Sequence, residues 1–246
     1  MSEFLRAAYE LGHKKLDKFV FCSGIGCSSW IPSPHFIADS VHTLHGRSIP
    51  VATGLKLMRP NLNVVVFGGD GDIVGIGLSH FIHAARRNLD ILVIMVNNMV
   101  YGMTGGQVAP TTPYKTKTTT TPYGSFEYPL DAAKLAVTAG AYYVSRWTTA
   151  HSKELKNSIK KALQMQGFRF IEAISQCPTA YGRRIGFKDS GEMLKWFKEN
   201  AIEKTEKANE KDLAGKIVVG EFIQRKRLTL GETMQRVIEE AQKNEN

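Results

Sequence analysis

The chain has 246 residues, 43% of them hydrophobic and 22% charged, so it can bury a core and wholesale disorder is excluded. Its longest apolar runs, 64–67 and 91–96, are too short to span a membrane, and no apolar segment near the N-terminus marks the chain for secretion. The three cysteines cannot build a disulfide framework, so we expect a cytoplasmic protein. The net charge of +9 comes without long Lys/Arg runs or interleaved aromatic residues, so we expect no binding to nucleic acid, and we expect none to a membrane.

Apolar periodicity and turn residues predict helices that alternate with strands. The predicted helices are 3–18, 48–59, 75–88, 130–139, 152–166 with Ser152 as its cap, and 231–243. The predicted strands are 19–21, 64–68, 91–96, 142–144, 168–174 and 216–222. Continuous apolar strands are typical of parallel sheets buried on both faces. We therefore predict an α/β fold with one open, mostly parallel sheet and helices on both faces.

The charge and the loops divide the chain further. Residues 188–246 hold 12 basic and 12 acidic residues, so the whole positive excess lies in residues 1–187 and favours an anionic ligand or partner there. We expect 1–187 to be the ligand-binding α/β domain and 188–246 to be a charged extension whose strand and helix pack on the same domain. The segment 99–129 has no apolar periodicity, and a loop of that length in a compact domain is usually functional.

The most informative motif joins two predicted strand ends. Gly69-Asp70-Gly71 ends the strand at 64–68, and Asn97-Asn98 ends the strand at 91–96. Adjacent parallel strands bring their carboxyl ends to one edge of the sheet, where ligands of such sheets bind. A carboxylate and an amide oxygen there suit Mg²⁺, while the glycines and the following helix N-terminus suit a pyrophosphate. A simple acidic turn followed by an unrelated asparagine pair is the alternative.

The spacing and its flanking stretches resemble a known family. Gly-Asp-Gly followed after about 25 residues by Asn-Asn resembles the thiamine diphosphate binding motif. The flanking stretches that narrow the match are 23–28 (SGIGCS), 42–47 (HTLHGR), 79–88 (SHFIHAARRN), 101–107 (YGMTGGQ), 110–112 (PTT) and 177–179 (CPT). Together they resemble the β subunit of the 2-oxoacid:ferredoxin oxidoreductases, and the stretches at 103–107 and 177–184 are most similar to the 2-oxoglutarate branch.

The resemblance implies a reaction and a cofactor. It implies a thiamine diphosphate and Mg²⁺ enzyme subunit for the coenzyme A-dependent oxidative decarboxylation of 2-oxoglutarate to succinyl-CoA, or the reverse carboxylation. It also implies an α subunit as partner, with γ and δ subunits in some members, and ferredoxin as the electron acceptor. The glutamate that activates the cofactor comes from the α subunit in this family, so we expect the chain alone to be inactive.

The resemblance also assigns residues. It implies that Asp70, Asn98 and the Val100 carbonyl bind Mg²⁺ and that His45 and Arg47 lie near the pyrophosphate or substrate as catalytic residues. Trp30 and Met103 are candidates for the substrate pocket, and Ile73 for the diphosphate. The full set expected to contact the cofactor is Gly24, Ile25, Gly26, Cys27, His45, Gly69, Asp70, Gly71, Asp72, Asn98, Val100, Gly102, Met103 and Thr104.

The cysteines match the family only in part. Its β subunits usually bind an iron–sulfur cluster through four cysteines, and Cys27 and Cys177 match two of them. The N-terminal Trp-Cys-Pro-x-Cys-Gly motif that supplies the other two does not occur in the chain, and Cys22 lies where the family needs none. Three thiolates cannot complete such a site. An upstream gene start, a shortened chain or a protein without a stable cluster would each explain this, so we expect a [4Fe-4S] cluster only if an upstream segment supplies two cysteines.

Several alternatives remain at this stage. Pyruvate or a branched-chain 2-oxoacid is the nearest rival substrate. Acetolactate synthases and transketolases share the Gly-Asp-Gly pattern but are longer chains in which the cysteines would have no use. A basic module that binds an acidic partner would explain the charge, although it leaves the motif spacing without a purpose.

Overall fold

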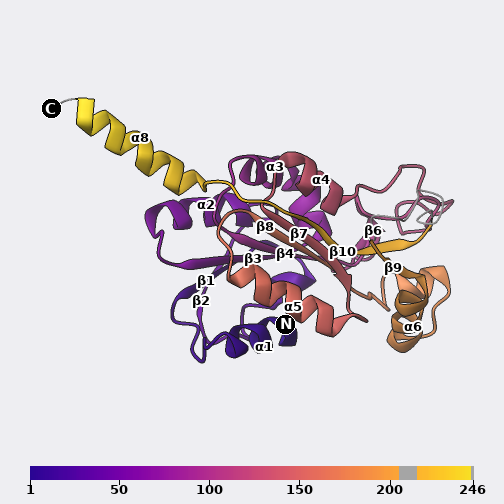
Figure 1. Cartoon of the computed structure of the whole chain (residues 1–246). Coiled ribbons are helices and arrows are strands. Elements are labelled where there is room, and N and C mark those ends of the chain that lie inside the picture. The colour runs from indigo at the N-terminus through magenta and orange to yellow at the C-terminus, as the bar shows by residue number, and fades with distance from the viewer. Residues whose placement is uncertain (205–214, 245–246) are drawn as a thin grey trace.

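The computed structural model describes residues 1–204 and 215–244, and it has one main sheet between two layers of helices (Figure 1). The helices are α1 (Ser2–Glu10), α2 (Ser48–Met58), α3 (Leu78–Arg86), α4 (Ala132–Ala139), α5 (Ser152–Leu163), α6 (Ser190–Asn200) and α8 (Leu230–Asn244). The strands are β1 (Phe19–Ser23), β2 (Asp39–His42), β3 (Asn63–Gly69), β4 (Leu92–Asn97), β5 (Val100–Tyr101), β6 (Gln107–Val108), β7 (Tyr143–Thr148), β8 (Arg169–Ile174), β9 (Ala201–Glu203) and β10 (Ile217–Gln224). Short 3₁₀ helices cover Cys27–Trp30 and Gly182–Ile185, and a kinked helical turn covers Gly71–Ile76.

The strand order of the main sheet is β2-β1-β3-β4-β8-β7-β10-β9. Neighbouring strands run parallel except β10, which pairs antiparallel with β7. The predicted open, mostly parallel sheet is thereby confirmed. Within the described ranges, none of the helices combines the length and the apolar content needed to cross a membrane.

Side chains of β3 and β4 alternate between two cores, because successive residues of a strand point to opposite faces. Val64 and Val66 pack with α2, α3 and α4 on one face, whereas Val65 and Phe67 pack with α1 and α5 on the other. The helices therefore cover both faces, as the continuous apolar strands predict. This double burial fixes the strands whose ends build the site.

Phe4 of α1 is the centre of an aromatic cluster on the second face. Its ring is 1% exposed and lies 5.4 to 6.0 Å from the rings of four other phenylalanines, Phe19, Phe21, Phe36 and Phe67. Phe4→Ala is expected to lower the free energy of unfolding by about 3–5 kcal/mol, since it leaves a cavity among rings that cannot collapse onto it. Urea unfolding followed by circular dichroism measures this.

Tyr9 on the same helix is the control, because its side chain is 65% exposed. Tyr9→Ala should change the free energy of unfolding by less than about 0.5 kcal/mol. Equal losses for the two variants would contradict the packing described for Phe4.

Several element predictions were wrong in extent. The helix expected at 3–18 ends at Glu10, because Gly12 adopts a left-handed φ of 88°. The helix expected to start at a Ser152 cap has His151 at that position, and the imidazole bonds Thr148 instead of capping the helix. The sequence pattern also missed β2, an exposed polar edge strand with no apolar alternation to detect.

The C-terminal part enters the sheet and then leaves the body of the molecule. Strand β10 pairs with β7, and Asp189 is the N-cap of α6, where its carboxylate accepts the Glu192 N–H. Part of the charged extension predicted at 188–246 lies outside the described residues. Helix α8 has no buried residue and projects from the sheet (yellow in Figure 1). The division into 1–187 and 188–246 stays a prediction.

Candidate functional site

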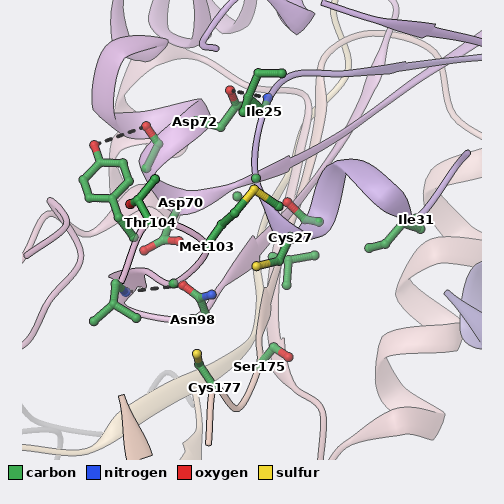
Figure 2. A pocket seen from close by; sticks show the side chains of 18 of the residues that line it. Ile25, Cys27, Ile31, Asp70, Asp72, Asn98, Met103, Thr104, Ser175 and Cys177 are labelled. Atoms are coloured by element: carbon green, nitrogen blue, oxygen red, sulfur yellow. Dashed lines mark hydrogen bonds between the residues drawn. The ribbon is translucent and has the colours of Figure 1, made fainter. Parts of the chain in front are cut away.

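A cavity of about 440 Å³ lies at the carboxyl ends of β1, β3, β4 and β8 (Figure 2). Each of these strands continues into a segment that lines it: 25–28, 69–72, 98–104 and 175–178. This is the edge at which open parallel sheets bind ligands. Most residues assigned from the sequence line it, namely Ile25, Gly26, Cys27, His45, Gly69, Asp70, Gly71, Asp72, Asn98, Val100, Gly102, Met103, Thr104 and Cys177.

Asp70 and Asn98 lie in this cavity as the strand-end argument predicts (Figure 2). The Asp70 carboxyl is 2% exposed, and burial raises its pKa to about 6 although Thr111 and the Gly71 and Asn98 backbone N–H groups donate to it. Within residues 1–204 and 215–244 it has no ion pair. A divalent cation among these oxygens would supply the missing positive charge, so the donor set fits Mg²⁺.

The turn after β4 brings the Asn98 side chain next to the Val100 backbone. Met99 lies between them with a left-handed φ of 66°, an uncommon conformation for a residue with a Cβ. The Asn98 Oδ1 accepts the Val100 N–H at 3.3 Å, and the Thr112 hydroxyl donates to the Met99 carbonyl at 2.6 Å. The shape of the turn is therefore fixed by side chains of this chain.

Asp72 joins two loops of the cavity. Its Oδ1 accepts the Gly46 N–H at 2.6 Å and the Ile25 N–H at 3.4 Å, and it lies 3.0 Å from Nδ1 of His45. Burial raises the pKa of this carboxyl, which those backbone donors and His45 partly oppose. Since its Oδ1 is already used by three donors, Asp72 shapes the site by holding the loops at 25–28 and 45–46 together.

His45 and Arg47 lie in different places. The His45 Nδ1 also lies 3.1 Å from the Ile25 carbonyl, so with acceptors on both sides it carries the proton and leaves Nε2 for groups in the cavity. Arg47 is outside the lining, at the start of α2, where it donates to the Gly46 carbonyl. Burial and, after it, the charge of Arg47 lower the pKa of His80 on α3. The structure does not bring these two expected catalytic residues together.

Three further assignments also lie outside the lining. Gly24 packs against Asp72, where a Cβ would overlap the carboxylate. Ile73 is 1% exposed and belongs to the hydrophobic core. Trp30 is 57% exposed and lies beside His42. The three residues therefore lie beside the cavity and are not among the residues that line it.

Comparison with known proteins identifies the fold family. Residues 24–173 match the family described as "Thiamine pyrophosphate enzyme, C-terminal TPP binding domain". The chain is 52% identical over 241 residues to the 2-oxoglutarate synthase subunit KorB of Methanocaldococcus jannaschii, an alignment that covers 97% of this chain and 88% of the relative. It is 50% identical over 233 residues to the KorB subunit of Methanothermobacter marburgensis, which covers 94% and 81% of the two chains.

The chain belongs to the β subunits of the 2-oxoacid:ferredoxin oxidoreductases. It falls in their 2-oxoglutarate branch and is a subunit of an oxidoreductase, so the basic binding module considered above is excluded as its main role. A solved structure agrees: the "2-oxoglutarate:ferredoxin oxidoreductase from Magnetococcus marinus with 2-oxoglutarate, coenzyme A and succinyl-CoA bound" has a TM-score of 0.85 and 34% identity, covering 97% of this chain and 82% of that chain.

The cysteines of this β subunit fall into two environments. Cys22 is fully buried in the hydrophobic core, which raises its pKa to about 12. Cys27 and Cys177 line the cavity, and burial together with the neighbouring Cys177 raises the pKa of Cys27 (Figure 2). Among the residues that the structure describes, no three His, Cys, Asp or Glu side chains are grouped to hold a metal ion.

These environments predict thiol reactivity. In the native protein, a small aromatic disulfide reagent is expected to modify Cys27 and Cys177 while leaving Cys22 unmodified, because only a thiolate in contact with solvent attacks the reagent. Mass spectrometry of tryptic peptides after brief labelling measures the sites. Cys22 should be labelled after unfolding in guanidinium, and labelling of Cys22 at native rates would contradict its core position.

The sequence pattern missed several polar groups of the site. Thr111 donates to Asp70, and the buried Ser28 hydroxyl at the cavity wall has no hydrogen-bond partner among the residues that the structure describes. Tyr101 packs over Gly71, where a Cβ would overlap its ring. The threonine-rich run after residue 110 could have indicated that Thr111 belongs to the site, whereas nothing in the local sequence distinguishes Ser28.

Proposed function

We propose that the chain binds Mg²⁺ and thiamine diphosphate and, in a complex with an α subunit, carries out the coenzyme A-dependent oxidative decarboxylation of 2-oxoglutarate to succinyl-CoA. The observation that carries the proposal is the pairing of buried Asp70 with Asn98 in one cavity at the carboxyl edge of the sheet. The relatives named for 2-oxoglutarate support this substrate over pyruvate or a branched-chain 2-oxoacid.

The cation would be held by Asp70, Asn98 and the Val100 carbonyl. Oxygen ligands of this kind suit Mg²⁺, which completes its shell with phosphate oxygens and water. The backbone at Gly69 carries no side chain, so it lets a diphosphate approach the cation, whereas the Cβ position of Gly71 is filled by the Tyr101 ring. The Ser28 hydroxyl, which has no partner within residues 1–204 and 215–244, lies beside Gly69 and is available as a donor to a bound phosphate.

The remaining lining residues would act on the substrate and its protons. When bound, thiamine diphosphate supplies a carbon nucleophile and an electron sink for the 2-oxoacid. Nε2 of His45 is free to exchange a proton with a group in the cavity, since Nδ1 is held by Asp72 and the Ile25 carbonyl. Apolar side chains of Ile25, Val96 and Met103 line the same space and give it an apolar wall.

Electron transfer and assembly complete the proposal. We place ferredoxin as the electron acceptor, the basic first 187 residues as the part that attracts such an acidic partner, and the cytoplasm as the location. Cys27 and Cys177 would ligate a [4Fe-4S] cluster only with two cysteines from elsewhere. The reverse, reductive carboxylation uses the same groups, and its direction follows from the supply of reductant.

Co-expression with the genes for the other subunits tests the function. The purified complex is expected to reduce a viologen dye with 2-oxoglutarate and coenzyme A, with much lower rates on pyruvate and branched-chain 2-oxoacids. The chain alone should bind Mg²⁺–thiamine diphosphate weakly and turn over nothing. Activity with pyruvate alone would contradict the proposed substrate, and turnover by the isolated chain would contradict the proposed need for an α subunit.

A further inference from the structure

The turn that carries Asn98 and Val100 is held in an uncommon backbone conformation from within the chain. Met99 has a left-handed φ of 66° and is 8% exposed. Its N–H donates to Oδ1 of Asn97 at 3.0 Å, and its carbonyl accepts the Thr112 hydroxyl at 2.6 Å. Because Met99 stands between Asn98 and Val100, its φ sets how far apart their oxygens lie.

The Asn97 amide has one orientation that serves Met99. Its Oδ1 must face the Met99 N–H, and Nδ2 must then find an acceptor on the opposite side. That acceptor is Oε1 of Glu172 on the neighbouring strand β8, at 2.8 Å. Glu172 is 2% exposed and Asn97 5%, so the two groups depend mainly on protein partners, although both line the wall of a second cavity of about 830 Å³.

Glu172 is in turn fixed by charge. Its Oε2 accepts Nε of Arg146 at 2.7 Å, and Arg146 also forms an ion pair with Asp131 at the N-terminus of α4. Burying such a group of charges costs desolvation that an apolar residue at 172 would avoid, so its presence needs a reason other than stability. Glu172 and Arg146 lie outside the lining of the 440 Å³ cavity and line the second one, so their contact with the site runs through Asn97.

We propose that Glu172 is a positioning residue for the Mg²⁺ site: by fixing the orientation of the Asn97 amide it holds Met99 in the left-handed conformation that presents Asn98 and Val100 to the cation. This inference rests on the proposed function, because it presumes that the cavity binds Mg²⁺–thiamine diphosphate. The outer partners of metal ligands typically contribute about 10- to 100-fold in metal affinity.

Isothermal titration of Mg²⁺ into the subunit complex saturated with thiamine diphosphate tests the proposal. Glu172→Gln and Asn97→Asp each place a mismatched pair at the contact, and each is expected to weaken Mg²⁺ binding about 10-fold or more. Tyr143→Phe is the matched control. Tyr143 lies on β7, the strand next to β8, and the substitution removes its hydroxyl, which donates to Glu221 at 2.9 Å. It should lower thermal stability and leave Mg²⁺ affinity unchanged.

The double variant that combines Asn97→Asp with Glu172→Gln separates positioning from simple loss of structure. In it, the new amide at position 172 can donate to the new carboxylate at position 97 and still accept from Arg146. The carboxylate at position 97 accepts the Met99 N–H and keeps the net charge of the group. We expect Mg²⁺ affinity within about 3-fold of the wild type. If the single variants do not fold, this double variant decides alone.

The outcomes distinguish the two levels of the argument. Weak binding by the single variants with recovery in the double variant supports the positioning role. Unchanged Mg²⁺ affinity in Glu172→Gln, or a folded double variant that stays weak, overturns it while leaving the proposed function in place. A wild-type complex that does not bind Mg²⁺–thiamine diphosphate overturns the proposed function and this inference with it.

Discussion

Asp70→Asn is expected to abolish Mg²⁺-dependent binding of thiamine diphosphate to the subunit complex, with affinity reduced by more than about 100-fold. The substitution removes the negative charge that a divalent cation needs while keeping the size of the side chain. Because Asp70 is 2% exposed and lacks an ion pair within residues 1–204 and 215–244, losing this charge does not leave another buried charge unpaired. The variant should therefore fold, and titration calorimetry with and without Mg²⁺ measures the loss.

Asp39→Asn provides the control for the loss of one carboxylate. Asp39 lies on the exposed edge strand β2, outside the cavity lining, so binding should stay at the wild-type level. Thr111→Val is an intermediate case, since it removes the hydroxyl that donates to Asp70 but no metal ligand. Wild-type affinity in Asp70→Asn would show that the cation, if any, lies elsewhere in the molecule.

Strand ends were the part of the site that the sequence could predict. The apolar runs at 64–67 and 91–96 locate two parallel strands, and their carboxyl ends place Asp70 and Asn98 together, as the structure confirms. This prediction succeeds because a buried parallel sheet leaves little freedom in where a strand ends. It needs no information about the loops.

Loop side chains could not be placed in the same way. Arg47 follows His45 by two residues, yet it lies at the N-cap of α2, donates to the Gly46 carbonyl and is outside the cavity lining. The hairpin of β5 and β6 lies inside a segment predicted to be structureless, and strands of two residues leave no periodic signal. In the sequence, nothing distinguishes Glu172 from other strand residues, and its role follows only from the contact with Asn97 that the structure shows.

Gly24→Ala is expected to destabilise the protein strongly, and Asp72→Ala should relieve that effect. A Cβ at Gly24 would overlap the Asp72 carboxylate, which cannot withdraw easily because Gly46, Ile25 and His45 hold its Oδ1. We expect Gly24→Ala to cost about 1–3 kcal/mol of unfolding free energy from overpacking. Asp72→Ala alone should cost a similar amount, because it leaves the buried N–H groups without an acceptor.

In the double variant the new methyl group occupies space that the carboxylate has vacated, so the two costs should not add. We expect the double variant to be more stable than the sum of the single losses predicts by about 1–3 kcal/mol, measured by chemical unfolding of all four proteins. Gly54→Ala controls for the glycine itself, because a Cβ there, within α2, meets no atom of the described residues within 4 Å and should not destabilise. Additive costs would mean that Gly24 and Asp72 do not constrain each other. The loop at 25–28 would then owe its position at the cavity to contacts other than this carboxylate.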